Sequence, residues 1–201
     1  MIRTANTTTT TALLEGLRDP SNETVWRGFD ARYRGVLVAF ARRLGLNDSE
    51  ASEVAQETLT RFLEEYSAGK FDRSRGRLRS WLIGIARYRI ADVKRVRARR
   101  REHHGESVLL ELPNKRRLTE IWDAELDQAI LCEAMTDLGS SGRFKPQTLQ
   151  AFRRMVVDQV SPRKVAEELD LTLQAVYMAK HHCLGKLKEL VANLKAAYEV
   201  E

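Results

Sequence analysis

The stretch Glu50–Arg101 decides the fold: it reads EASEVAQETLTRFLEEY over residues 50–66, SAGKFDRSRGR over 67–77 and LRSWLIGIARYRIADVKRVRARRR over 78–101. The first part is acidic, and small or apolar residues recur in it at steps of three and four, which predicts an amphipathic helix. Gly69 and Gly76 interrupt the pattern, and a second helix is expected from Leu78. The expected inward positions are Ala51, Val54, Ala55, Thr58, Phe62, Tyr66, Leu78, Leu82, Ile85, Ala86 and Val93.

The second part of this stretch is strongly basic. From Arg73 to Arg101 it carries a run of arginines and Lys94 against a single acid, Asp92. Three aromatic residues lie among the cations, namely Phe71, Trp81 and Tyr88. Cations neutralise phosphates and flat rings stack on unpaired bases, so the segment favours nucleic acid as a partner. The alternative is a solvated arginine-rich helix, which is the better interpretation of an isolated charge run.

The composition predicts an all-α protein made of two small helical domains. The chain has 201 residues, of which 43% are hydrophobic and 31% charged, with only 11 Gly and 4 Pro. Such a chain can bury one modest core or two small ones. We expect a first domain over residues 12–101, a flexible linker over 102–119 and a second domain over 120–197. The net charge of +6 hides a separation of acids near 48–65 from bases in 73–101, which suggests two differently charged surfaces.

Upstream of the acidic stretch, one long helix is expected. Its apolar stripe follows helical steps through Trp26, Phe29, Tyr33, Val36, Leu37, Phe40 and Leu44. Asp19 or Ser21 can cap its start, and Gly45 can end it in the left-handed conformation. Asn47–Ser49 then supplies the cap of the next helix.

The second domain is expected to begin with helices near residues 120–138 and 144–157. The linker before it contains His103 and His104, which no cysteine or carboxylate accompanies at zinc-site spacing. Residues 161–190 then predict a helix-turn-helix. Ala166 provides a small residue where two helices cross, Asp170 tolerates positive φ in the turn, and Val176 anchors the second helix. Ser161 and Thr172 are the expected caps. A plain helical hairpin is the alternative.

The second helix of this motif carries the candidate residues for reading duplex DNA. Its N-terminal half would present Gln174, Tyr177, Met178 and His181 to base edges in the major groove, and Thr172 at its start belongs to the same expected DNA-binding set. Lys180, His182 and Lys186 are better placed for phosphates. His181 and His182 point about 100° apart as helix neighbours, so they are poorly placed to chelate one ion.

The sequence offers no sign of catalysis, a cofactor or a metal site. Its acids lie on one helix face, and no nucleophile with basic partners occurs at a recognised spacing. Cys132 and Cys183 stand alone, which favours a reducing cytoplasm over a disulfide. The Thr-rich start lacks an apolar signal segment, and no stretch reaches membrane-spanning length. We therefore expect a soluble cytoplasmic protein that needs neither cofactor nor metal, makes no membrane contact and is not an enzyme.

Taken together, these motifs resemble bacterial RNA polymerase sigma factors of the extracytoplasmic-function (ECF) type. Glu50–Glu57 is similar to the family's acidic "DAEDLVQE" stretch, and Phe71–Leu82 to its "FDxxRGRFRAWL" stretch. Ile85-Ala86-Arg87 and the arginine run continue the likeness. The recognition helix, Ala175–His182, resembles a subgroup with a "VYxAK" signature rather than members whose recognition helix is rich in arginine.

The resemblance implies a role for each part of the chain. Residues 12–101 would be a region 2-like domain and residues 120–197 a region 4-like domain. Glu53, Gln56 and Glu57 would bind the clamp helices of the largest subunit of core RNA polymerase, and the second domain would dock on the flap of the second-largest. The minus-ten promoter element would be recognised and melted by Phe71, Arg73, Arg75, Arg77, Arg79, Trp81, Arg87, Tyr88 and Arg95, with a loop pocket near Phe71–Arg77 receiving an extruded base. The helix-turn-helix would read the minus-thirty-five element.

Three other functional classes remain open at this stage, and one of them is a pure interaction module, which DNA binding without polymerase and without promoter preference would favour. A helix-turn-helix regulator acting without polymerase would leave the acidic helix and the arginine-aromatic segment unexplained. A nuclease or recombinase would need a catalytic cluster that the motifs do not supply. An anti-sigma protein is a possible further partner of a sigma factor.

Overall fold

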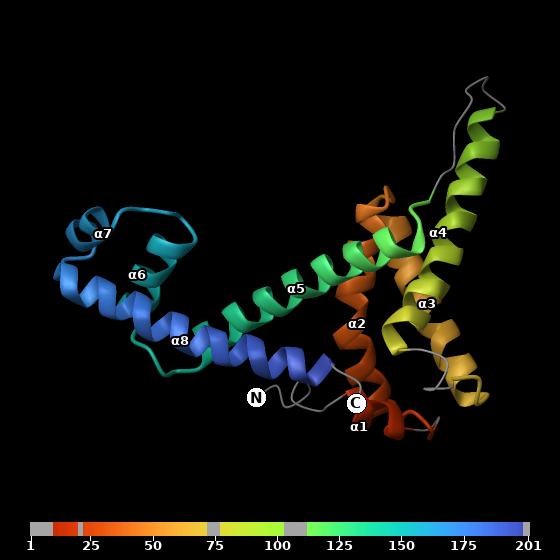
Figure 1. Ribbon diagram of the computed structural model, residues 1–201, viewed down its shortest axis with the longest axis horizontal. Coiled ribbons are helices and arrows are strands. Elements are labelled where there is room, and N and C mark those ends of the chain that lie inside the picture. Colours follow the sequence, from red (N-terminus) through yellow and green to blue (C-terminus); the bar gives the residue numbers. More distant parts are fainter. Residues whose placement is uncertain (1–9, 20–21, 72–76, 103–111, 199–201) are drawn as a thin grey trace. The chain divides into compact units, whose positions relative to one another are not determined.

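The computed structural model describes residues 10–19, 22–71, 77–102 and 112–198. These residues form eight helices and no strand, which confirms the predicted all-α class (Figure 1). They divide into two compact units. Unit 1 takes the described residues up to Ala129 together with Ala197 and Tyr198, and unit 2 takes Ile130–Ala196.

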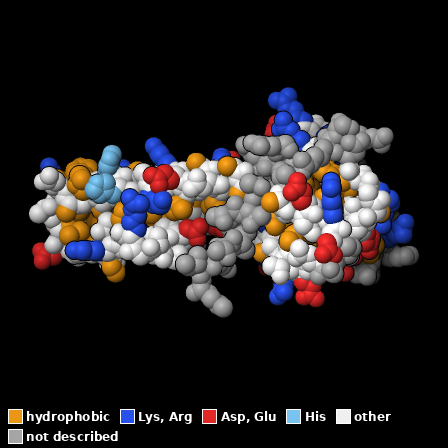
Figure 2. Space-filling view, turned by 90° about the horizontal axis from the view of Figure 1, so that it is seen from below, with side chains coloured by type: hydrophobic (Ala, Val, Ile, Leu, Met, Phe, Trp, Pro, Cys, Tyr) orange, Lys and Arg blue, Asp and Glu red, His pale blue; other side chains and the backbone are white. Residues whose placement is uncertain are grey.

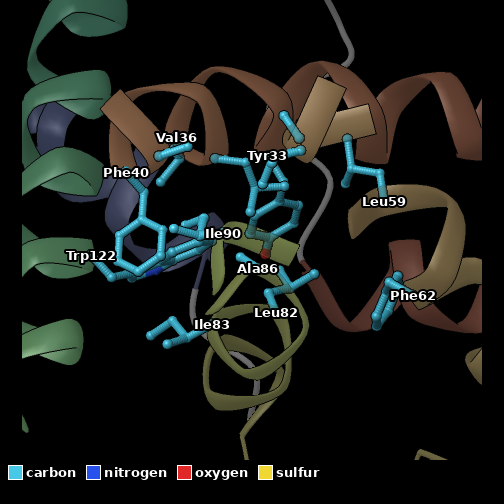
Figure 3. Packing of buried hydrophobic residues seen from close by; sticks show 14 of the residues in the cluster. Tyr33, Val36, Phe40, Leu59, Phe62, Leu82, Ile83, Ala86, Ile90 and Trp122 are labelled. Atoms are coloured by element: carbon cyan, nitrogen blue, oxygen red, sulfur yellow. The ribbon is translucent and has the colours of Figure 1, made fainter. Parts of the chain in front are cut away.

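Unit 1 contains α1 (Thr10–Gly16), α2 (Glu23–Arg43), α3 (Asp48–Ser67), α4 (Leu78–Glu102) and the first half of α5 (Lys115–Ser140). Its core is a continuous cluster of side chains from α2, α3 and α4, shown from close by in Figure 3. Phe29 stacks on Phe62 with ring centroids 4.8 Å apart and contacts Tyr33 at 4.6 Å. The apolar stripes expected for these helices therefore meet in one core.

The ends of α2 and α3 follow mostly from capping chemistry in the sequence. Gly45 has φ +92°, as the helix stop required, and Asn47 forms a reciprocal capping box with Glu50. At the start of α2 the expectation was wrong. The cap is neither Asp19 nor Ser21 but Asn22, whose Oδ1 accepts a hydrogen bond from the Val25 amide at 3.2 Å.

The start of α5 also differs from expectation, because this helix begins at Lys115 rather than near residue 120. Asn114 explains the difference, since its Oδ1 accepts a hydrogen bond from the Arg117 amide at 3.0 Å. The early turns are not linker-like. Leu118 and Trp122 are each 1% exposed and belong to the unit 1 core, where Trp122 meets Phe40 edge-on at 5.6 Å (Figure 3).

Unit 2 contains the second half of α5 with α6 (Pro146–Val156), α7 (Pro162–Glu168) and most of α8 (Leu173–Tyr198). The predicted helix-turn-helix is present as α7 and α8. Asp170 has φ +50°, and the Thr172 Oγ1 accepts from the Ala175 amide at 3.1 Å, as a cap should. Val176 is fully buried in a cluster with Val165 and Ala151, beside Ala166. Ser161 occupies the cap position of α7 without a side-chain hydrogen bond.

Several expectations fall on residues outside those described. They are the Thr-rich start over 1–9, Ser21, the loop 72–76 with Arg73 and Arg75, and the linker segment 103–111 with His103 and His104. Of the described helices, none combines the length and apolarity that a bilayer crossing requires.

The packing predicts that Phe29→Ala destabilises unit 1 by about 3–5 kcal/mol, because it leaves a cavity beneath Phe62 and Tyr33. Unfolding in urea, followed by tryptophan fluorescence, measures this directly, since Trp26, Trp81 and Trp122 all lie in unit 1. Tyr88→Ala is the control, because Tyr88 is 62% exposed and its loss should change stability by less than about 0.5 kcal/mol. Equal effects of the two substitutions would contradict the packing described here.

Candidate nucleic-acid interface

The outer surface of α4 holds a groove of about 430 Å³. One face of α4 supplies most of the lining, because the residues are three or four apart, and Leu112 from the segment expected to be linker completes it. The lining residues are Gly84, Arg87, Tyr88, Ala91, Lys94, Arg95 and Leu112. Positive charge and an aromatic ring thus share one concave surface. Arg87, Tyr88 and Arg95 of this lining were among the candidate residues from the sequence, whereas Gly84, Ala91, Lys94 and Leu112 were not.

The cations of the groove differ in their surroundings. Arg87 is exposed, while Arg95 donates to Asp92 with Nη1 and Oδ1 2.8 Å apart. Lys94 is half-buried, and this burial, with a smaller contribution from nearby Arg97, lowers the pKa of its ammonium group. An anion bound in the groove would favour the charged form of Lys94 and so be attracted by it.

Three other arginines of α4 are engaged within unit 1. Arg79 contacts Asp123 of α5, with Nη1 and Oδ1 2.7 Å apart, and Arg89 lies 3.5 Å from the Glu57 carboxylate. Arg97 binds the Glu50 carboxylate, with Nε and Oε1 2.6 Å apart, and donates to the Gly45 carbonyl at 3.1 Å. Arg79 was expected at the minus-ten element, and in the structure its guanidinium pairs with a carboxylate of α5. Part of the basic run therefore makes ion pairs within unit 1, and the remaining cations are available to a ligand.

Phe71 and Trp81 are partly buried, and their expected contact with bases stays a prediction. Their rings stack on each other, with centroids 5.0 Å apart and planes inclined by 4°. Trp81 also donates to the Glu65 carboxylate at 3.1 Å, and both rings pack against the core. Of the three aromatic residues, Tyr88 is the one whose ring is largely exposed. Arg77, at the start of α4, is exposed as well.

The acidic face of α3 lies outward, with Glu53, Gln56 and Glu57 all exposed. Glu57 is the carboxylate paired with Arg89, and Gln56 accepts a hydrogen bond from Arg34 of α2. Among the described residues, Glu53 has no hydrogen-bond or ion-pair partner. The burial of Val54, Ala55 and Thr58 on the opposite side of α3 fixes this orientation.

The residues of unit 2 that were expected to read DNA lie at the start of α8. Exposed side chains there are Thr172, Gln174, Tyr177, Met178, Lys180, His181 and His182. Tyr177 is 53% and Met178 45% exposed, so both side chains are open to contact with a partner. Lys186 is less open and pairs with Glu189 at 2.8 Å. Figure 2 shows histidine side chains standing beside hydrophobic and basic ones on the surface.

The described residues contain no group of three or more histidines, cysteines or carboxylates that could hold a metal ion. His181 and His182 lie with ring centroids 5.7 Å apart at 61°. Cys183 is fully buried, and this burial raises the pKa of its thiol. Among the described residues, the charged surfaces of α3, α4 and α8 remain the candidate binding surfaces.

The family model for sigma-70 region 2 matches residues 29–102. The match runs from α2 through the end of α4, so it includes both the acidic face and the groove. The matched segment is therefore similar to sigma-70 region 2, and it covers less than half of the chain. No curated protein matches the chain.

Substituting Arg97 and Arg87 in turn should distinguish an arginine that stabilises the fold from one that contributes little to stability. Arg97→Gln removes contacts to Glu50 and Gly45 and is expected to lower the free energy of unfolding by about 1 kcal/mol, since the pair is partly exposed. Arg87→Gln should leave stability within about 0.5 kcal/mol. Urea unfolding of both variants checks this, and a larger loss for Arg87→Gln would reverse the assignment.

Proposed function

We propose that this protein is an ECF-type sigma factor that binds core RNA polymerase and directs promoter-specific initiation. The proposal rests on one observation, namely that two packed helices within the matched region present surfaces of opposite charge. α3 turns an acidic face outward, while α4 carries a basic groove with an exposed aromatic ring. Region 4-like function is proposed for the helix-turn-helix of unit 2, outside the matched residues.

The acidic face of α3 is proposed to bind the clamp helices of the largest polymerase subunit through Glu53, Gln56 and Glu57. Their exposure supports this role. Glu57 and Gln56 already contact Arg89 and Arg34, so cations of the polymerase would exchange with these partners. Because exposed ion pairs contribute little stability, such an exchange costs unit 1 little.

The minus-ten element is proposed to lie along α4, with Arg77, Arg87 and Arg95 at phosphates and Tyr88 against a base. Local unstacking of a duplex costs a few kcal/mol, and binding to the unpaired strand offsets that cost and stabilises the open state. Phe71, Trp81 and Arg79 then act by ordering the start of α4. The roles expected for Arg73 and Arg75, and the proposed base pocket near Phe71–Arg77, rest largely on residues outside those described.

The minus-thirty-five element is proposed to be read by the start of α8 in the major groove. Gln174, Tyr177, Met178 and His181 would meet base edges, while Lys180, His182 and Lys186 meet phosphates. Thr172 caps the helix and can contribute to the same surface. In the alternative function, a helix-turn-helix regulator, this surface would act alone, and the acidic face of α3 would have no role.

Reversing charge with Glu53→Lys and Glu57→Lys together should weaken binding to core polymerase at least tenfold, because like charges placed in an interface repel. Glu15→Lys with Glu23→Lys is the control, since both residues are exposed on α1 and α2. Affinity for labelled core enzyme measures the effect, and tryptophan-detected unfolding verifies the fold. Equal affinity of the test and control variants would argue against the docking role.

Replacing Gln174 and Tyr177 by Ala should change the preferred upstream promoter sequence, because a good base contact contributes about 1–3 kcal/mol of discrimination. Selection of promoters from a randomised upstream element, with the reconstituted holoenzyme, reads this out. Gln150→Ala removes an exposed amide from α6 and should leave the preference unchanged. An identical selected motif for wild type and the double variant would remove these residues from base recognition.

A further inference from the structure

The first helix of the helix-turn-helix gains little from capping or from packing. α7 has seven residues, and its cap residue Ser161 makes no side-chain hydrogen bond. A helix of this length is not stable alone and needs tertiary support. The buried side chains that join α7 to α6 and α8 are small, namely Ala151, Val165, Val176 and Ala179. Small side chains bury little area, so the orientation of α7 needs a further constraint.

α6 supplies this constraint through polar contacts at both of its ends. In its last turn, the Arg154 guanidinium bridges two carboxylates, with Nη2 2.7 Å from the Glu168 Oε2 and Nη1 3.0 Å from the Asp158 Oδ2. In its first turn, the Gln147 amide nitrogen donates to the Leu169 carbonyl at 2.8 Å. Glu168 is the last residue of α7 and Leu169 follows it, so both ends of α6 hold the segment that leads into the turn.

Arg154 also holds the loop between α6 and α7. Its carbonyl accepts a hydrogen bond from the Val160 amide at 2.9 Å, and its guanidinium pairs with Asp158 of the same loop. Gln159 lies between these two residues and has φ +54°, which is uncommon for a residue other than glycine. Such a conformation persists only where the surrounding contacts maintain it. One arginine therefore ties both the entry and the exit of α7 to α6.

The surroundings of Arg154 favour a role within unit 2 over a contact with phosphate. Its Nε also donates to Glu168, at 3.2 Å, so Nε, Nη1 and Nη2 all face carboxylates. These two carboxylates offset the charge of the guanidinium and would repel a phosphate nearby. Arg153, the preceding residue of α6, is exposed instead. Two arginines of one helix, with the same charge, thus have different surroundings.

We propose that Arg154, assisted by Gln147, is a positioning residue for base recognition by the start of α8. By holding Glu168 and the turn after it, Arg154 sets the direction in which α8 leaves the turn, and hence where Gln174 and Tyr177 meet a duplex. Arg154 itself makes no contact with DNA. The inference rests on the proposed reading of an upstream element by unit 2, and it adds two residues that lie outside the recognition helix.

Amide hydrogen exchange and duplex selection, both with the full chain and without polymerase, test the proposal. Arg154→Gln should speed exchange of the Leu169 and Leu171 amides, which donate to carbonyls of α7, about threefold. The second readout is the ratio of affinities for the duplex that the wild type selects from a randomised pool and for a scrambled duplex. Arg154→Gln should reduce this ratio about fivefold, because displaced side chains lose base contacts. The slope of log K against log salt should not change, since no phosphate contact is lost.

Arg153→Gln is the matched control, because it removes the same charge from the adjacent position of α6. It should leave exchange in the turn and the affinity ratio at wild-type values. Glu168→Gln should act in the same direction as Arg154→Gln, and combining the two should add little, because both remove one interaction. Arg154→Lys keeps the charge without the planar fork, so it provides a milder variant should Arg154→Gln fail to fold.

Faster exchange, a reduced affinity ratio and a wild-type salt slope would together support the proposal. Faster exchange with an unchanged ratio would show that Arg154 only stabilises unit 2, and a slope smaller by roughly 0.9 would make it a phosphate contact. Either result would overturn the proposal, as would unchanged exchange. A wild-type chain that selects no motif would instead contradict the proposed reading of DNA by unit 2, and exchange alone would then decide whether Arg154 holds the turn.

Discussion

The packing of α2, α3 and α4 around Phe29 and Phe62 is the constraint on which the candidate sites depend. Once these rings stack and Val54, Leu82 and Ala86 are buried, the rotation of α3 and α4 about their axes is fixed. The acidic side chains of α3 and the groove of α4 must then face solvent. Hydrophobic burial sets the geometry, and the partly exposed ion pairs contribute less stability than the core.

The same core divides the basic residues of α4 into two groups. Arg79, Arg89 and Arg97 reach carboxylates of α5 and α3 and hold the helices in register. Arg87, Lys94 and Arg95 line the groove. An arginine-rich helix is therefore neither wholly a ligand surface nor wholly a solvated face. In the proposed sigma factor, this division would let unit 1 bind a strand of promoter DNA on α4 while α3 binds polymerase.

Much of the fold could be predicted because helix periodicity and capping are local. The stripe of α2, the stop at Gly45, positive φ at Asp170 and the Thr172 cap all follow from nearby residues. What could not be predicted depends on contacts distant in sequence. The burial of Trp122, the pairing of Arg79 with Asp123 and the stacking of Phe71 on Trp81 required the tertiary packing. The groove likewise needed Leu112, which no pattern connects to α4. Asn114 is a favourable N-cap residue for α5, but it lies where the hydrophobic periodicity lapses, so the sequence placed the start of this helix too late.

The most direct test of the account is reconstitution of the purified chain with bacterial core RNA polymerase on fragmented genomic DNA, at a stated salt concentration because phosphate contacts weaken as salt rises. Co-elution with core enzyme and mapping of transcript starts are measured together. The account predicts a stable complex and new start sites that share two spaced upstream motifs. Absence of co-elution, with DNA binding retained by the chain alone, would contradict it and favour a regulator that acts without polymerase.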